Sequence, residues 1–367
     1  MRAGHLSCRT RCLFTLAGLA AVLLGGCTVV GPTAISSGRL AYNEAITVTD
    51  NQQMLMVLVH NRYGERGHLL SVASVTANVS VTTSAGVEAG FGSSSDYAGN
   101  LVPFAGSVVY EENPTISYIP VVGEKYLRQL TTPIPLDMLT QFTRSTTAPG
   151  DFLVALVNEV NGIYNPDFNF TDRDDDPRFS EFTRLITELS RDHRLQWVER
   201  QGHENQFSMV IDRSAPEHAS QVATLLRLLN LPPAIQQPGN LLVLPISLAL
   251  GGGEDGGVGF STRSVWDMVE ILSARIEVPP ADERDGVVVP APPPGRMGKD
   301  LNIQFSADKP ETAYVAVEYR DGWFYIDERD MKTKQYFKLL GSLWSMVMSN
   351  AAGQGAAAPV LTVPVSR

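Results

Sequence analysis

The chain has 367 residues, which is enough for two or three globular domains. Hydrophobic residues make up 44% and charged residues 19% of the chain, a composition that argues against a disordered or fibrous protein. Acidic residues outnumber basic residues by 39 to 29, which gives a net charge of −10. This balance argues against a nucleic-acid binder, because such a protein needs a concentrated basic surface.

Residues 1–26 have the pattern of an export signal. Three arginines precede an apolar run from Leu13 to Leu24, which is shorter than the ~20 residues of a membrane-spanning helix. The run is followed by Gly25-Gly26-Cys27, which resembles the lipobox of bacterial lipoproteins, where small residues fit the peptidase and the cysteine thiol accepts the lipid. An ordinary cleaved secretory signal and an uncleaved short anchor are the alternatives.

The lipobox resemblance implies that Cys27 carries several fatty chains, such as palmitate, which anchor a protein stably to a membrane. Because residue 28 is Thr rather than Asp, the resemblance favours the outer membrane, with the protein facing the periplasm. Removing 26 residues, three of them arginines, leaves a mature chain of 341 residues with a net charge of −13. Cys8 and Cys12 leave with the signal, so no cysteine remains for a disulfide, a metal site or a nucleophile.

After the signal, the sequence predicts an α+β fold in which antiparallel hairpins pack against amphipathic helices. Five segments are expected: a lipidated tether (27–38), an N-terminal α+β module with a long β-hairpin (39–165), an α-β-β-α-β module (166–250), a Gly-rich linker (251–260) and a C-terminal module of helix, Pro-rich spacer, β-hairpin and helix (261–367).

In the N-terminal module, Asp50 is expected to cap a helix that Gly64 ends. Alternating apolar residues, with Ser71 as the exception, predict a strand at 69–81, and a second strand is expected at 102–110. A flexible Gly/Ser-rich tip would join them. Pro120 indicates that the next extended segment is an edge strand. Helices are expected at 123–130, 135–142 and 151–164.

In the middle module, a helix is expected from Pro177 to Asp192. Ser214 and Glu217 have the spacing of a capping box that opens a second helix to Asn230. Strands are expected at 195–199, 207–211 and 241–248.

In the C-terminal part, six glycines among residues 251–259 predict a mobile loop or linker. Ser264 is expected to cap a helix, and the prolines of 279–294 predict a spacer. Arg320-Asp321-Gly322 is typical of a hairpin turn. Further strands are expected at 301–305, 313–319, 323–326 and 359–365, and a last helix at 332–348.

The long hairpin of the N-terminal module has three possible roles. Polar residues such as Asn78, Ser80 and Thr82 suit an ordinary sheet with one face in water. Alternatively, strands of this length suffice to cross a bilayer, so that several subunits could each donate one hairpin to an oligomeric ring. The hairpin could also dock onto another protein.

The sequence predicts no catalytic, cofactor-binding or metal-binding residue. The mature histidines do not have the spacing of a metalloprotease motif, and neither a nucleophile elbow nor a phosphate-binding loop is present. These histidines are His60, His68, His193, His203 and His218.

Two acidic clusters allow a binding or a structural interpretation. The acidic run at 172–176 is similar to a calcium loop, but Pro177 stands where that loop needs Gly and Thr183 where it needs Glu, which favours helix capping. The second cluster suits a sugar-binding face, or else its aromatic residues pack under the last helix. It comprises Asp321, Asp327, Glu328 and Asp330 with Tyr319, Trp323, Phe324 and Tyr325.

Segments 114–134, 262–279, 314–340 and 359–365 resemble a group of uncharacterised proteobacterial outer-membrane lipoproteins. This group has no established activity, so the resemblance implies export and anchoring but transfers no catalytic residue.

The expected function is a non-enzymatic scaffold, adaptor or accessory component of a cell-envelope assembly. The expected partners are the membrane, through Cys27, and envelope proteins, with an oligomer possible and no cofactor or nucleic acid. One alternative is an envelope hydrolase acting on glycan or peptide, with a carboxylate pair not visible in the sequence. The other is a lipoprotein that binds a small ligand.

Overall fold

The computed structural model has the α+β fold that the sequence predicts. The expected export signal, the hairpin tip at 88–103 and the acidic run at 172–176 lie outside the described residues. The chain divides into two units, Met1–Gln53 and Met54–Arg367. The described ranges are 27–65, 70–76, 79–87, 104–112, 115–120, 124–146, 148–166, 177–199, 206–231, 239–253, 256–291, 301–353 and 361–364.

The first described element is α2 (Cys27–Arg62), a continuous helix of 36 residues. The residues of the expected tether are therefore helical, and the prediction that Asp50 is an N-cap is wrong, because it lies inside the helix. The hydroxyl groups of Thr47 and Thr49 donate to carbonyls four residues earlier, so these residues do not interrupt the helix. The predicted end is confirmed: Gly64 has a φ of 68°, a left-handed conformation that ends helices.

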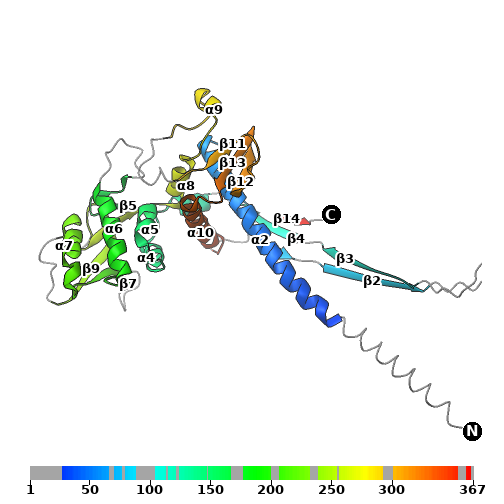
Figure 1. The fold of residues 1–367 in the computed structure, drawn as a ribbon, viewed down its shortest axis with the longest axis horizontal. Coiled ribbons are helices and arrows are strands. Elements are labelled where there is room, and N and C mark those ends of the chain that lie inside the picture. The colour runs from blue at the N-terminus through cyan, green and yellow to red at the C-terminus, as the bar shows by residue number, and fades with distance from the viewer. Residues whose placement is uncertain are drawn as a thin grey trace, which may run out of the picture. The chain divides into compact units, whose positions relative to one another are not determined.

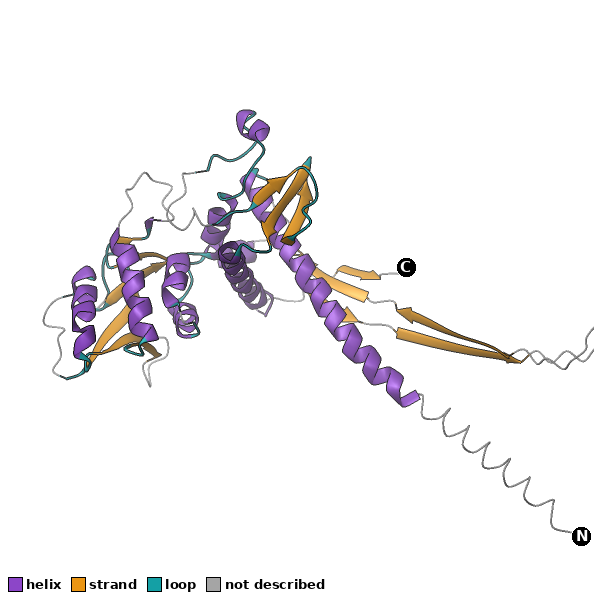
Figure 2. Cartoon of the chain, in the orientation of Figure 1, coloured by secondary structure: helices purple, strands orange, loops and turns teal. Residues whose placement is uncertain are grey.

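Four strands between residues 70 and 120, here called the ribbon, form two antiparallel pairs (Figure 2). Its four strands are β1 (Leu70–Thr76), β2 (Val79–Val87), β3 (Phe104–Glu112) and β4 (Thr115–Pro120). β1 pairs with β4, and β2 pairs with β3. The predicted hairpin is thus confirmed, but its first arm consists of two described strands instead of one.

The base of the ribbon is a three-stranded sheet with the order β1-β4-β14. β14 (Leu361–Pro364) confirms the strand expected in the tail and lies at the edge. The prediction that β4 is an edge strand is wrong. Pro120 is the last residue of β4, and β14 pairs only with Thr115 to Tyr118, so the missing N–H of Pro120 interrupts no bond to β14.

A six-stranded sheet with the order β6-β5-β10-β9-β8-β7 crosses the expected module boundaries. β9 and β10 are parallel, and all other neighbours are antiparallel. Residues before 165, between 166 and 250, and after 257 therefore share one sheet. The strands are β5 (Val157–Val160), β6 (Ile163–Tyr164), β7 (Leu195–Glu199), β8 (Phe207–Asp212), β9 (Leu241–Leu248) and β10 (Val258–Thr262).

Helices cover one face of this sheet (Figure 1). Along β9, Leu242, Leu244 and Ile246 are buried, whereas Leu241 and Val243 on the other face are exposed. The helices are α4 (Leu136–Arg144), α5 (Pro149–Leu156), α6 (Pro177–Arg191) and α7 (Ala219–Leu228). A short 3-10 helix (Pro216–His218) leads into α7 without a side-chain cap, so the expected capping box does not form.

The helix expected at 151–164 ends at Leu156 and is followed by the hairpin β5–β6. Asn161 and Gly162 form the turn, with φ values of 45° and 79°. Asn-Gly between strand-forming residues favours such a two-residue turn, and this local signal outweighs the helical spacing of the apolar residues.

The last three residues of the expected Gly-rich linker, 258–260, belong to β10 of the six-stranded sheet. β10 begins at Val258, and a Cβ added at Gly259 would lie 2.6 Å from the backbone of Gly252. The carboxylate of the buried Glu159 accepts a hydrogen bond from the Gly251 N–H at 2.7 Å. Here the glycines allow two backbone segments to touch, a close approach that a side chain would prevent.

The predicted cap of α8 (Val265–Ser273) is confirmed. The Asp267 N–H donates to the Ser264 hydroxyl at 3.1 Å, and the Ser264 N–H donates to the Asp267 carboxylate at 2.7 Å. β11 (Gln304–Ser306), β12 (Ala313–Tyr319) and β13 (Gly322–Asp327) form an antiparallel sheet in the order β11-β13-β12. α10 (Met331–Gly353) packs against α8 and α3 (Glu124–Thr131).

A fully buried arginine joins these parts. The guanidinium of Arg263 donates to the carbonyls of Val154 and Ala155, in the last turn of α5, at 2.7 and 2.8 Å. Its Nε donates to the Asn158 side chain at 2.9 Å. The last carbonyls of a helix have no partner within the helix and carry partial negative charge, so a cation satisfies them well.

We expect Arg263→Met to lower the free energy of unfolding by about 3 kcal/mol, because it leaves buried carbonyls without donors. Urea denaturation of the mature chain measures this value. Arg191→Met, at an exposed position of α6, is the control and should change it by less than ~0.5 kcal/mol. Equal losses in the two variants would contradict the role of Arg263.

Candidate functional site

The β2–β3 part of the ribbon has two chemically different faces. In antiparallel strands, opposed residues share a face and successive residues alternate between faces. One face, here called the apolar face, carries Val79, Val81, Thr83, Ala85 and Val87 with Phe104, Gly106, Val108, Tyr110 and Glu112. The other, here called the hydroxyl face, carries Ser80, Thr82, Ser84 and Gly86 with Ala105, Ser107, Val109 and Glu111.

The base of the ribbon contains a bulge. Val72 lies opposite Tyr118 and Ser74 lies opposite Ser117, so Ala73 is an extra residue in β1. The extra residue places Val72 and Val75 on one face of β1, whereas regular alternation would place them on opposite faces. Ser71, the exception in the expected pattern, was therefore the signal of a bulge.

The edges of this ribbon are open and uncharged. Within the described residues, β2 and β3 pair only with each other, so the outer backbone groups of both strands have no neighbouring strand. Residues 79–87 and 104–110 include no charged residue, although the chain average of 19% predicts about three in sixteen positions. Soluble proteins usually protect edge strands with charges or prolines. These edges are suited to receive further strands.

The aromatic residues of the C-terminal hairpin do not form one open sugar-binding face. The Phe324 side chain is 1% exposed, and its ring lies 5.2 Å from that of Phe305. The Tyr319 ring lies 5.3 Å from His60 and 5.1 Å from Tyr63, both near the end of α2. Phe324 and Tyr319 thus pack against other rings of the fold, whereas Trp323 and Tyr325 are half-buried.

The acidic residues expected at that face serve local structure. Asp330 caps α10, since its carboxylate accepts from the Thr333 N–H at 3.0 Å and from the Thr333 hydroxyl at 2.6 Å. Asp327 accepts from the Arg329 N–H at 2.7 Å, and Glu328 pairs with Lys334. Three of the four carboxylates thus bind groups that are near them in the sequence.

Arg320, in the hairpin turn, makes a cation–π contact and an ion pair that the sequence did not predict. The Arg320 guanidinium lies 4.4 Å from the centroid of the Tyr63 ring and pairs with Glu65 at 3.3 Å. A hydrogen bond from Tyr319, and then the contact with Arg320, hold the pKa of Glu65 below its ordinary value. Only a turn was expected here, because nothing local in the sequence indicates that α2 lies beside the turn.

The proline-rich segment after α8 is tied to the same end of α2. It includes the short helix α9 (Pro280–Arg284), where the Tyr63 hydroxyl donates to Asp282 at 2.6 Å. Burial, and then this hydrogen bond, raise the pKa of Tyr63. Arg62 donates to the Val289 carbonyl, and the Val289 N–H donates to the Arg62 carbonyl at 2.8 Å. The expected spacer is therefore held by hydrogen bonds at 282 and 289.

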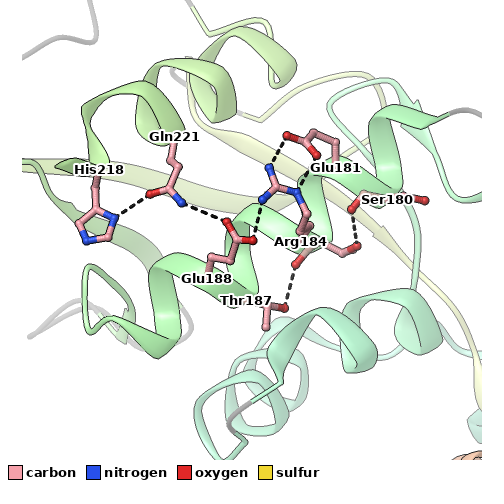
Figure 3. A network of polar contacts seen from close by, with 8 residues as sticks. Ser180, Glu181, Arg184, Thr187, Glu188, His218 and Gln221 are labelled. Carbon is pink, nitrogen blue, oxygen red and sulfur yellow. Dashed lines mark hydrogen bonds and ion pairs between the residues drawn. The ribbon is translucent and has the colours of Figure 1, made fainter.

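Figure 3 shows a chain of polar contacts that joins α6 to the start of α7. His218 Nδ1 lies 2.7 Å from Gln221 Oε1, and the Gln221 amide donates to Glu188 at 3.0 Å. Arg184 donates to Glu188 at 2.6 Å and makes a bidentate pair with Glu181. Gln221 thus links α7 to α6, and His218 contacts Gln221 from the turn before α7. His193 lies in the turn after α6, and His68 and His203 lie outside the described residues.

Among the described residues, no three His, Cys, Asp or Glu side chains are grouped so that they could hold a metal ion. No helix in that part of the chain has both the length and the apolar composition to cross a membrane. No family model, curated protein or solved structure matches the chain. Its function is therefore argued from its own residues.

We expect Asp330→Ala to lower the free energy of unfolding by about 1 kcal/mol, because it removes the cap of α10. Chemical denaturation of the mature chain checks this value. Asp321→Ala, in the exposed hairpin turn, is the matched control and should change it by less than ~0.5 kcal/mol. If neither variant differs from the wild type, Asp330 is not a structural cap.

Proposed function

We propose that this chain is an outer-membrane lipoprotein, anchored through Cys27, that faces the periplasm and acts without catalysis as a component of a cell-envelope assembly. The amphipathic ribbon of β1–β4 carries this proposal. An apolar face beside open, uncharged strand edges is typical of a surface that further strands or apolar partners cover.

The N-terminal sequence supports the anchor. A basic start, a short apolar run and Gly25-Gly26-Cys27 occur in the order of a lipoprotein signal, and Thr28 replaces the Asp that favours the inner membrane. The resemblance to proteobacterial outer-membrane lipoproteins agrees with this order. A cysteine with two or more acyl chains would hold the chain stably at a membrane, whereas a single chain would bind it only weakly.

Three carboxylates of the body have a lowered pKa. Hydrogen bonds lower the pKa of Glu65, Glu181 and Asp212, and the largest contributions come from Tyr319, Arg184 and Ser214 respectively. A hydrolase acid needs a raised pKa, so these three groups do not suit that role.

We expect Cys27→Ser to abolish incorporation of labelled palmitate and to remove the protein from the lipid-bound membrane fraction, because the acceptor thiol is lost. Cys12→Ser, within the signal, is the matched control and should be labelled like the wild type. Labelling of Cys27→Ser at the wild-type level would contradict the anchor. Capture from cross-linked envelopes tests the assembly role: recovery of neither an envelope protein nor a further copy of the chain would contradict it.

A further inference from the structure

The distal half of the ribbon has the length of a membrane-crossing hairpin. β2 and β3 oppose each other in nine residue pairs, from Val79 and Glu112 to Val87 and Phe104. A tilted strand of ~9–11 residues suffices to cross the hydrocarbon core of a bilayer. Seven of these pairs, from Val81 and Tyr110 to Val87 and Phe104, include no charged residue and come within about two residues of one crossing in each direction.

The two faces of this half have the composition that membrane-crossing strands require. Such strands alternate between apolar residues toward the lipid and small or polar residues toward a water-filled interior. The apolar face carries four valines, one alanine and one phenylalanine among its ten positions. The hydroxyl face carries four serine or threonine residues among its eight positions.

Charged residues flank the uncharged stretch at both of its ends. Glu111 and Glu112 close β3 at the base, and Glu88 follows β2 in the sequence at the other end. Acidic side chains are costly in the hydrocarbon core and favourable at its borders. A ribbon in water has no physical need to exclude charge over nine residues of one strand and seven of the other.

In a bilayer, the unpaired edges of the ribbon need hydrogen-bonding partners from other strands. In hydrocarbon no water is available, so every backbone N–H and C=O needs a partner within protein, and an isolated two-stranded ribbon cannot meet this condition. Within the described residues, each copy of the chain has one β2 edge and one β3 edge without a neighbouring strand. The β3 edge of one copy can pair in antiparallel fashion with the β2 edge of the next, and a head-to-tail contact that closes leaves no open edge.

We infer that the β2–β3 hairpin crosses a lipid bilayer, where hairpins of several copies of this chain pair edge to edge into a closed ring. The apolar face lies toward lipid and the hydroxyl face toward a water-filled interior. This inference rests on the proposed lipid anchor, which brings the copies to one membrane.

Two adjacent threonines test the inference. Thr82 lies on the hydroxyl face and Thr83 on the apolar face, so Thr82→Cys and Thr83→Cys place the same small side chain on opposite faces. With Cys27 acylated, each variant has one reactive thiol. The full lipidated chain is labelled with an environment-sensitive fluorophore and reconstituted into vesicles of phosphatidylcholine and phosphatidylglycerol.

Nitroxide-labelled lipid should quench the label at position 83 about tenfold more than the label at position 82, because alternation places only one of them in hydrocarbon. Aqueous iodide should give the reverse order. Quenching of both labels by iodide would overturn the inference. So would a label at 83 that neither agent reaches, since a protein partner would then cover the apolar face.

Vesicle flotation distinguishes a failure of the ribbon inference from a failure of the proposed lipid anchor. If both variants float with the vesicles but position 83 stays accessible to iodide, the anchor stands and the ribbon inference fails. If neither variant floats although palmitate is attached, the proposed anchoring itself fails.

A second pair of variants tests the water-filled interior. Val81→Asp places a charge on the apolar face, and Thr82→Asp places it on the hydroxyl face. We expect Val81→Asp to reduce the release of a small dye from loaded vesicles about tenfold, and Thr82→Asp to leave it close to the wild-type level. Equal release from both variants, or no release from the wild type, would overturn the closed ring.

Discussion

The backbone register of the ribbon determines which residues the chain can present together. Val79 lies opposite Glu112 and Val87 lies opposite Phe104, so β2 and β3 keep one register over all nine pairs. A slip of one residue would transfer every valine of β2 to the other face relative to β3. In the base, the bulge at Ala73 sets which residues of β1 share a face, and β14 adds a third strand beside β4.

Buried polar contacts hold the body to which this ribbon belongs. Arg263 joins the end of α5 to the start of α8, and Tyr63 joins the end of α2 to Asp282. In each case a donor reaches an acceptor far away in the sequence. A buried donor that loses its acceptor costs more than an ordinary hydrogen bond contributes, so such contacts favour one arrangement of the chain over its competitors.

Local signals predicted the elements that depend on local chemistry. The helix from Pro177, the cap at Ser264, the hairpin around Arg320 and the tail strand all form as expected. The expected cap at Asp50 fails because α2 already begins at Cys27, and the helix expected at 151–164 fails because Asn161-Gly162 makes a turn. The pairing of strands that are distant in the sequence could not be predicted, because the sequence does not indicate which strands join the six-stranded sheet. For the same reason, the alternating apolar residues of β1 and β2 indicated an amphipathic strand. They did not indicate the register of β2 against β3, which places the valines of β2 on the same face as Val108 and Phe104.

Cross-strand disulfide formation measures this register most directly. Thr82 lies opposite Val109, and Thr83 lies opposite Val108. Opposed pairs alternate between closer and wider spacing, so cysteines at one of these two pairs should close a disulfide within the chain. Cysteines at 82 and 108 lie on opposite faces and should remain free thiols. Closure of the offset pair, with neither opposed pair closing, would contradict the register and the two faces that depend on it.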